Sequence, residues 1–411
     1  MLWIKMGWRN LWRNRRRSLI ELTSIAGSVF LAVFMNNLAV GSYALMIDAG
    51  VRMGSGHIGL YRSDYLELRK TELTIKADTL ISALERDPAV NAVYPRLNVP
   101  CLIRSSRDSR SSVVIGMEIA REKDSNPILK AEKIVKGELP SDNDSQGALM
   151  GETLAKELGI DVGNKFVIMT QGSGGEISSR LLRVTGLIRT NARMIDAVTV
   201  IVPRKVLENI IGETDSAHEI AVMLHDHRMI EKTLPRIRAI ARTQTDVDAF
   251  QWEKAMPGLA NAVKMDHVGL QIMVVFMYLI VGIGTINTLL MSVMERTREF
   301  GVIRAIGVSR TGIRKMVISE AFVLAVTGVV AGIFLASVVG LYTASKGIDY
   351  SFMIKDQGFA GTLMDPVMYS GWAWLDTFML CGGMIVLALF ASLYPAHYIM
   401  KTQPSEAMRK Y

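Results

Sequence analysis

The chain has 411 residues, of which 50% are hydrophobic and 21% are charged, with a formal net charge of +8 and a mean hydropathy of +0.25. This average is too apolar for an ordinary soluble enzyme and too polar for a protein that consists only of membrane helices. It indicates a few membrane spans together with a sizeable soluble domain. No motif for binding RNA or DNA accompanies the positive charge, so nucleic acid is not expected as a partner. The two cysteines, Cys101 and Cys381, lie far apart in the sequence and predict no disulfide.

Four apolar runs are long enough to cross a bilayer, which requires about 20 residues of helix. The first, residues 22–47, and the second, residues 268–294, contain no Asp, Glu, Lys or Arg. The first run is too long for a signal peptide and has no clear cleavage site after it, so we expect a retained span. With their flanks, the four runs predict membrane helices over residues 18–47, 268–294, 317–345 and 372–398.

Basic residues border these spans on one side. They gather before the first span, between the second and third, and after the fourth. Because Lys and Arg are enriched in cytoplasmic loops, all three groups fall on the cytoplasmic side of a chain with four spans. Both termini are then cytoplasmic, with a cytoplasmic tail at 399–411. An extracytoplasmic domain at 48–267 and a short external loop at 346–371 face the other side.

The first 17 residues mix tryptophans with arginines. Trp8 and Trp12 are four residues apart and therefore share a helix face. This composition predicts an amphipathic helix that lies along the inner leaflet, at residues 1–17. A plain positive flank of the first span is the alternative, and it differs only in whether the helix is ordered.

The segment 48–267 has the pattern of an α+β domain inserted between the first two membrane helices. Strands are predicted at 98–104, 112–117, 165–170, 177–188, 198–202 and 219–224, and helices at 152–158 and 229–241. Pro203 fits the first turn of a further helix. No Ser/His/Asp set stands out, and His225, Asp226 and His227 lack the further ligands that a zinc site needs. We therefore expect no catalytic residue, no metal site and no cofactor in this chain.

The most informative stretch, residues 295–316, joins the second and third spans and places charged and apolar residues together where a membrane helix ends. Phe300, Ile303 and Ile306 are spaced i, i+3, i+6 and form a face that we expect to insert into a groove of a partner. Gly301 and Gly307 permit close approach and chain reversal. Ser309 is expected to cap the following helix. An ordinary amphipathic loop helix is the alternative.

The same stretch carries a family resemblance. The signature of FtsX/MacB-type ABC transporter permeases is similar to residues 287–310, NTLLMSVMERTREFGVIRAIGVSR, and the family's C-terminal pattern resembles residues 393–409, LYPAHYIMKTQPSEAMR. The LolC/LolE-like, lipoprotein-releasing branch is similar at residues 8–19 (WRNLWRNRRRSL), 56–61 (GHIGLY) and 248–263 (DAFQWEKAMPGLANAV). The resemblance covers both ends and all four apolar runs and is weaker across the external domain.

The resemblance implies a coupling helix that sits on a separate ABC ATPase subunit. The ATPase-coupling positions would be Glu295, Arg296, Arg298, Glu299, Phe300, Gly301, Ile303, Arg304, Ala305, Gly307 and Arg310. Two ATPases and two permeases would form a complex in the bacterial inner membrane, the second permease being another copy or a paralogue. The ATPase would bind ATP and Mg, because this chain has no Gly-x-x-x-x-Gly-Lys-Ser/Thr motif.

The LolC/LolE-like branch implies extraction of a lipoprotein or similar amphiphile from the outer leaflet toward a periplasmic carrier. MacB-like export of peptides or amphiphiles, with a membrane-fusion protein, is one alternative. FtsX-like signalling to a periplasmic enzyme without transport is the other.

Polar and small residues within the apolar runs predict a dimer seam or a route for lipid. Asn36, Asn287, Gly328 and Gly332 lie in the spans, and the last two form a small-xxx-small pair. Met46 and Met53, at the end of the first span and on the stalk beyond it, have flexible side chains suited to acyl chains. Packing within one subunit is the alternative for the small residues.

Overall fold

The computed structural model describes residues 2–13, 15–190, 192–350 and 367–401. Its contacts divide the chain into two compact units. One is a helical bundle drawn from residues 1–43, 265–349 and the chain from 367 onward, and the other is an α+β domain with its core in residues 44–264. The predicted fold class, an α+β domain inserted between the first and second of four membrane helices, is confirmed.

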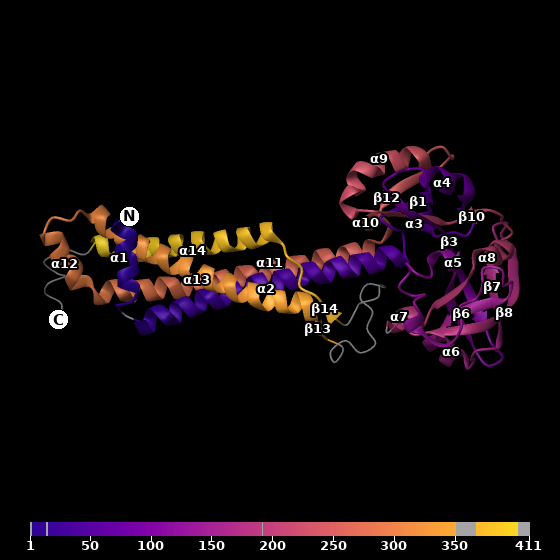
Figure 1. Ribbon diagram of the computed structural model, residues 1–411, viewed down its shortest axis with the longest axis horizontal. Helices are drawn as coiled ribbons and strands as arrows, with labels where there is room; N and C mark the ends of the chain where they lie inside the picture. The colour runs from indigo at the N-terminus through magenta and orange to yellow at the C-terminus, as the bar shows by residue number, and fades with distance from the viewer. Residues whose placement is uncertain (1, 14, 191, 351–366, 402–411) are drawn as a thin grey trace. The chain divides into compact units, whose positions relative to one another are not determined.

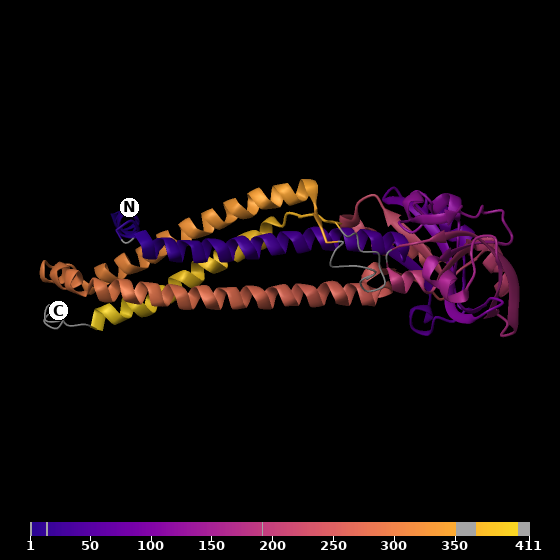
Figure 2. The same ribbon diagram turned by 90° about the horizontal axis from the view of Figure 1, so that it is seen from below.

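Four helices of the described chain are long and apolar enough to cross a membrane. They are α2 (Arg15–Met53), α11 (Pro257–Glu295), α13 (Arg310–Lys346) and α14 (Trp374–Lys401). Figure 1 and Figure 2 both show them running side by side. At 39 residues each, α2 and α11 are longer than a hydrocarbon core of roughly 30 Å requires, so part of each lies outside it.

Shorter elements complete the bundle. The N-terminal helix α1 (Leu2–Leu11), the helix α12 (Thr297–Ala305) and the end of α14 lie at one end of it in both views (Figures 1 and 2). A short hairpin pairs β13 (Ile348–Asp349) with β14 (Val367–Met368). The predicted helix in the first 17 residues is therefore present as α1. It packs closely on α13 at Gly7, where a Cβ would lie 3.0 Å from the carbonyl oxygen of Ser319.

The predicted small-residue pair is a close contact between α13 and α2. A Cβ on Gly328 would lie 2.7 Å from Ile25 Cγ2, and one on Gly332 would lie 2.7 Å from both the carbonyl oxygen of Ala26 and Val29 Cβ. Both glycines thus let the two helices approach within a single chain. Their part in a seam between two subunits stays a prediction.

The α+β domain is built on a ten-stranded sheet in the order β12-β1-β11-β3-β4-β9-β6-β8-β5, with β7 paired to β3 and β8. Its strands are β1 (Ile58–Arg62), β3 (Val90–Arg104), β4 (Ser109–Met117), β5 (Ile134–Gly137), β6 (Gly147–Gly151), β7 (Lys165–Gln171), β8 (Ile177–Ile188), β9 (Thr199–Pro203), β11 (Glu219–Leu224) and β12 (Val247–Gln251). A small separate ladder pairs β2 (Ile75–Lys76) with β10 (Ser216–Ala217). The helices are α3 (Tyr65–Leu68), α4 (Ala77–Leu84), α5 (Ile119–Glu122), α6 (Glu152–Leu158), α7 (Arg193–Asp196), α8 (Arg204–Ile211), α9 (Ile230–Ala241) and α10 (Trp252–Ala255), with 3-10 turns η1 (Ala131–Lys133) and η2 (His227–Met229).

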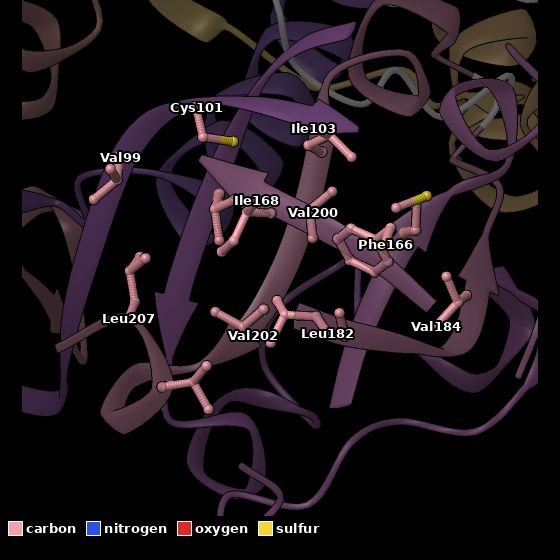
Figure 3. Packing of buried hydrophobic residues seen from close by; sticks show 14 of the residues in the cluster. Val99, Cys101, Ile103, Phe166, Ile168, Leu182, Val184, Val200, Val202 and Leu207 are labelled. Atoms are coloured by element: carbon pink, nitrogen blue, oxygen red, sulfur yellow. The ribbon is translucent and has the colours of Figure 1, made fainter. Parts of the chain in front are cut away.

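Strand β3 joins two lobes of this domain. Its first half, residues 90–96, pairs with β11, and its second half, residues 97–104, pairs with β4. The first lobe packs α4 and α9 on β1, β11 and β12 around side chains such as Val93 and Ile237. The second lobe encloses the larger core of Figure 3, where Phe166 lies beside Val200, and Cys101 and Leu207 belong to the same cluster. Each half of one strand therefore belongs to a different hydrophobic core.

The strands and helices predicted for this domain are present, some with longer bounds. Strand β3 starts eight residues before the predicted 98–104, and β1, β6 and β12 were not expected. Pro203 ends β9 and precedes α8, so the expectation that it lies in the first helical turn is wrong by one residue. Asp226 caps the turn η2 by accepting a hydrogen bond from Arg228 N at 2.9 Å.

Candidate functional site

The connection between α11 and α13 is a tight helical turn. The helix α11 ends at Glu295, and Arg296 leaves the helical conformation with φ −100° and ψ 12° before α12 begins. The chain then reverses at Gly307, whose φ is +105°, a left-handed value that favours glycine. Ser309 Oγ accepts a hydrogen bond from Gly312 N at 3.2 Å and caps α13. The predicted reversal at Gly307 and the predicted cap at Ser309 are confirmed.

Ion pairs fasten this turn to the rest of the bundle. Arg17 forms a bidentate salt bridge with Glu295, with N···O distances of 2.6 Å and 2.8 Å, and Arg13 forms a bidentate salt bridge with Glu299. Arg296 bonds to Glu299 at 3.2 Å and, through Nη1, to Glu320 of α13 at 3.1 Å. The hydrogen bond from Arg13 is the main reason that the pKa of Glu299 is lowered.

These pairs surround a polar cavity of about 240 Å³. Three of the charged residues that the sequence assigned to a partner, Glu295, Arg296 and Glu299, thus hold the turn onto the rest of the bundle.

The prediction that Phe300 belongs to a docking face is wrong. Its side chain is only 2% exposed and packs into a cluster with Val293, Ile313, Met316 and Ile399. Ile303 is half-buried against the same cluster. The i, i+3 spacing that predicted a docking face is instead the face by which α12 attaches to its own bundle, because an amphipathic helix turns its largest apolar residues to the nearest core.

The opposite face of α12 is open. Arg298, Val302, Ala305 and Ile306 follow one another at i, i+4, i+7 and i+8, a spacing that places them on one side of the helix. Val302 is 46% exposed and Ile306 79% exposed. Of the other predicted coupling positions, Gly301 is buried, Arg304 is half-buried, and Gly307 and Arg310 are exposed. We call Arg298, Val302, Ala305 and Ile306 the outer face of α12.

The residues predicted to form a seam differ in their exposure. Asn287 is exposed on α11, whereas Met46 is only 6% exposed. Met53 packs against the core around Met117 in the α+β domain. Met46 thus offers little free surface to an acyl chain, whereas Met53 is half-buried, and their part in a route for lipid stays a prediction. Asn36 Nδ2 is buried without a hydrogen-bond partner in the described part of the chain.

A buried arginine that the sequence analysis missed secures the end of α2. Arg96 of β3 is 1% exposed and donates to Glu122 through Nε at 3.1 Å and Nη2 at 2.6 Å. The same guanidinium donates to the carbonyl oxygens of Arg52 at 2.7 Å and Met53 at 2.6 Å, in the last turn of α2. The signal was present, since Arg96 is a lone charge within the apolar run NAVYPRLNVPC.

Glu21 is a second missed residue. It lies at the boundary of the first apolar run and is 4% exposed. Its carboxylate accepts hydrogen bonds from Thr285 Oγ1 at 2.5 Å and Thr288 Oγ1 at 2.9 Å, which ties α2 to α11. Buried carboxylates in a helical bundle require such partners.

Comparison with known families decides the identity of the chain. The family model described as MacB-like periplasmic core domain matches residues 18–240, more than half of the chain, and the model described as FtsX-like permease C-terminal matches residues 271–404. The chain belongs to the FtsX/MacB family of ABC transporter permeases. The resemblance noted in the sequence is confirmed, and the outer face of α12 lies within the FtsX-like segment.

Relatives of this permease include LolC and MacB proteins. The lipoprotein-releasing system transmembrane protein LolC of Xylella fastidiosa is 22% identical over 99% of this chain and 98% of its own length. LolC of Neisseria meningitidis is 24% identical over 97% of this chain and 95% of its own length. The macrolide export ATP-binding/permease protein MacB of Bordetella avium is 23% identical over 80% of this chain, which corresponds to 50% of MacB. The permease therefore matches LolC from end to end and MacB over half of that protein's length.

Proposed function

We propose that this permease is a non-catalytic subunit that carries ATPase motion across the inner membrane to an extracytoplasmic domain. There the motion extracts a lipoprotein or similar amphiphile from the outer leaflet toward a periplasmic acceptor. Both termini and α12 lie in the cytoplasm in this proposal, in keeping with the basic residues that flank the spans. ATP and Mg are bound by a separate ABC ATPase, two per complex, with a second permease copy or a paralogue.

The observation that carries the proposal is the outer face of α12. A short helix at the turn between two spans exposes Val302 and Ile306, 46% and 79%, beside an exposed Arg298. Aliphatic side chains flanked by arginine are typical of helices that insert into a groove of a partner. The opposite face is anchored by Phe300 and by the ion pairs of Glu295 and Glu299, so a force applied to α12 is passed to the bundle.

The continuity of α2 supports transmission beyond the bundle. The helix starts beside the pair formed by Arg17 and Glu295 and runs without interruption to Met53. Its last turn is held by Arg96, which belongs to the strand shared by the two lobes of the α+β domain. One helix is therefore fastened to the coupling turn at one end and to the sheet at the other.

The docking step is tested by replacing the two apolar side chains of the outer face with charged ones. The full-length permease carrying Val302→Glu and Ile306→Glu is co-expressed with its ABC ATPase and purified through a tag. Buried apolar anchors of interfaces contribute about 2–4 kcal/mol each to binding. We therefore expect the double variant to bind the ATPase more weakly by a factor of roughly 30 or more, and to lose it during purification. Phe300→Asp is unsuitable for this purpose, since a charge in that core would destabilise the bundle itself.

A matched control carries the same substitution at a distant position. Ile177 in the α+β domain is 78% exposed, nearly the same as Ile306, and Ile177→Glu should leave ATPase retention unchanged. Normal retention in the Val302→Glu, Ile306→Glu variant would remove the assignment of α12 as the docking helix.

The cargo is tested separately. The permease and its ATPase are reconstituted in nanodiscs with an acylated protein, and ATP-dependent release to a soluble acceptor is measured. If the complex hydrolyses ATP but releases cargo to none of the acceptors tried, extraction is contradicted. The MacB match favours one alternative, in which a soluble peptide moves only when a membrane-fusion protein is added. Recovery of a periplasmic hydrolase that ATP activates, with no cargo moved, would instead indicate FtsX-like signalling.

A further inference from the structure

An apolar cavity of about 180 Å³ lies between α1, α2 and α13, apart from the outer face of α12. Its walls include Trp8, Trp12, Leu19 and Leu22, and its rim includes Arg15 and Ser18. The two indole rings meet edge to face with centroids 6.0 Å apart. An apolar cavity of roughly 150 Å³ holds a molecule as large as benzene, so this one has room for a stretch of acyl chain.

The apolar side chains that line the cavity are exposed to solvent. Trp8 is 48% exposed, Trp12 47% and Leu19 49%. The hydroxyl of Thr327, which also lines the cavity, already donates to the carbonyl oxygens of Val323 at 2.8 Å and Leu324 at 3.0 Å. That hydroxyl therefore needs no water molecule in the cavity as a hydrogen-bond partner. A site with these walls favours an apolar ligand over solvent.

The arginines around α1 and the start of α2 divide into two sets. Arg13 and Arg17 are neutralised by Glu299 and Glu295. Arg9, Arg15 and Arg16 are exposed and have no carboxylate partner within the described ranges of the chain. Of this second set, Arg15 is at the rim of the cavity. An unneutralised positive rim beside an apolar cavity complements a ligand with an anionic head and an apolar tail.

The position along the chain selects the source of that ligand. Arg15 to Arg17 lie between one and two helical turns before the uncharged run that starts at Leu22, so the rim lies near the point where a membrane helix leaves the hydrocarbon core. Tryptophan and arginine are both enriched at this depth, among the phospholipid headgroups. A bilayer lipid is already present there at high concentration.

We propose that α1, the start of α2 and α13 form a binding site for one anionic phospholipid of the bilayer. Its acyl chain packs against Trp8, Trp12, Leu19 and Leu22, and its phosphate lies beside Arg15. The site is separate from the outer face of α12 and does not rest on the function proposed for that face. The bound lipid fixes α1 on α2.

The test is a competition between two lipids that differ only in headgroup. The full-length permease is purified from nanodiscs that contain equal amounts of phosphatidylglycerol and phosphatidylcholine with the same acyl chains, and native mass spectrometry counts the lipids retained per chain. We expect one retained lipid per chain, predominantly phosphatidylglycerol. Because a basic residue at a membrane surface is worth about 1 kcal/mol, Arg15→Gln should lower the ratio of phosphatidylglycerol to phosphatidylcholine roughly fivefold.

Arg314→Gln is the matched control. Arg314 is exposed at the start of α13 and is not part of the cavity, so its removal deletes the same charge without touching the site. Equal retention of the two lipids by the unmodified chain, or an equal effect of Arg15→Gln and Arg314→Gln, would overturn the proposal. Trp12→Ala should reduce retention of both lipids. If Trp12→Ala instead dissociates a dimer and leaves lipid retention intact, the cavity is a contact between copies and the proposal is wrong.

Discussion

Arg96 offers the sharpest test of how the end of α2 is held. Its side chain is 2% exposed and faces Glu122, which is 0% exposed, so both members of the ion pair are removed from water. Burial alone would lower the pKa of Arg96, but the neighbouring carboxylates of Glu122 and Glu219 outweigh it and the pKa is raised. Replacing Arg96 with Met leaves the Glu122 charge without its partner and two carbonyl groups of α2 without their donor.

The size of the effect follows from this burial. Removal of one member of a buried ion pair costs about 3–5 kcal/mol. For a domain of 150–250 residues, 1 kcal/mol lowers the midpoint of thermal unfolding by about 2–4 °C. We therefore expect Arg96→Met to lower the midpoint of the α+β domain by roughly 6–20 °C. Adding Glu122→Gln removes the stranded charge and should restore part of that loss.

Cys101 provides a local reporter of unfolding in that domain. It is 9% exposed in the core of the second lobe, and burial raises the pKa of its thiol to about 12. In a Cys381→Ser background, labelling by a maleimide therefore occurs only when the domain opens. The midpoint is the temperature at which half of Cys101 is labelled in a short pulse.

The control for Arg96→Met is the same substitution at a bridge whose arginine is exposed. Arg236 pairs with Asp87 at 2.9 Å, and the side chain of Arg236 is 52% exposed although that of Asp87 is 8% exposed, so Arg236→Met should cost less than Arg96→Met. A midpoint for Arg96→Met that is within 2 °C of the Arg236→Met value, on the scale of about 2–4 °C per kcal/mol, would refute the reasoning. So would a double variant with Glu122→Gln that is no more stable than Arg96→Met alone.

Three further predictions concern single buried positions. Burial lowers the pKa of His218, whose two ring nitrogens form hydrogen bonds with backbone groups, so the unfolded chain binds a proton that the folded domain does not. The stability of the domain, measured by Cys101 labelling, should therefore fall as the pH drops through about 6.5. His218→Gln should make the stability less dependent on pH in this range. Gly332→Ala places a Cβ 2.7 Å from the carbonyl oxygen of Ala26 and should lower the free energy of unfolding of the bundle by about 1–3 kcal/mol, whereas Gly27→Ala, with open space around it, should not; equal unfolding midpoints for the two variants would contradict the packing. Asn37 is 0% exposed and its side-chain Nδ2 and Oδ1 have no hydrogen-bond partner in the described chain, so Asn37→Leu should stabilise the bundle by about 1–3 kcal/mol, and a lower midpoint would disagree with that.

The number and type of the membrane helices were predictable because they depend on composition over about 20 residues. An uncharged run of this length has no other stable environment than a bilayer or a large core. The strands of the α+β domain were also predictable where apolar and polar residues alternate, as in β7 and β8. Strand β1 was missed because a continuous apolar stretch carries no such alternation, and its burial depends on β11 and β12, which lie far away in the sequence. The tail of the C-terminal pattern, residues 402–409, lies outside the described residues.

Residues 295–316, the predicted coupling segment, illustrate what periodicity leaves undecided. The sequence identified α12, its reversal at Gly307 and its cap at Ser309, because these depend on local chemistry. It did not tell which apolar face turns inward, since Phe300 and Ile303 on one side and Val302 and Ile306 on the other both have helical spacing. The choice is made by side chains more than 90 residues away, such as Ile399, and by Arg13 and Arg17, near the other end of the chain.

That choice has a mechanical consequence. If Phe300 were the docking anchor, the helix would have to leave its own core in order to bind, and binding would compete with attachment to the bundle. With Phe300 buried and Ile306 outside, α12 can hold a partner and the bundle at once. The bidentate pairs of Glu295, at the end of α11, with Arg17 and of Glu299, in α12, with Arg13 then resist sliding of this turn against the N-terminal part of the chain. A single apolar contact does not do so, because carboxylate–guanidinium pairs fix geometry as well as distance. In the proposed function, a helix anchored on one face and open on the other would transmit displacement in both directions, as a subunit coupled to a separate ATPase requires.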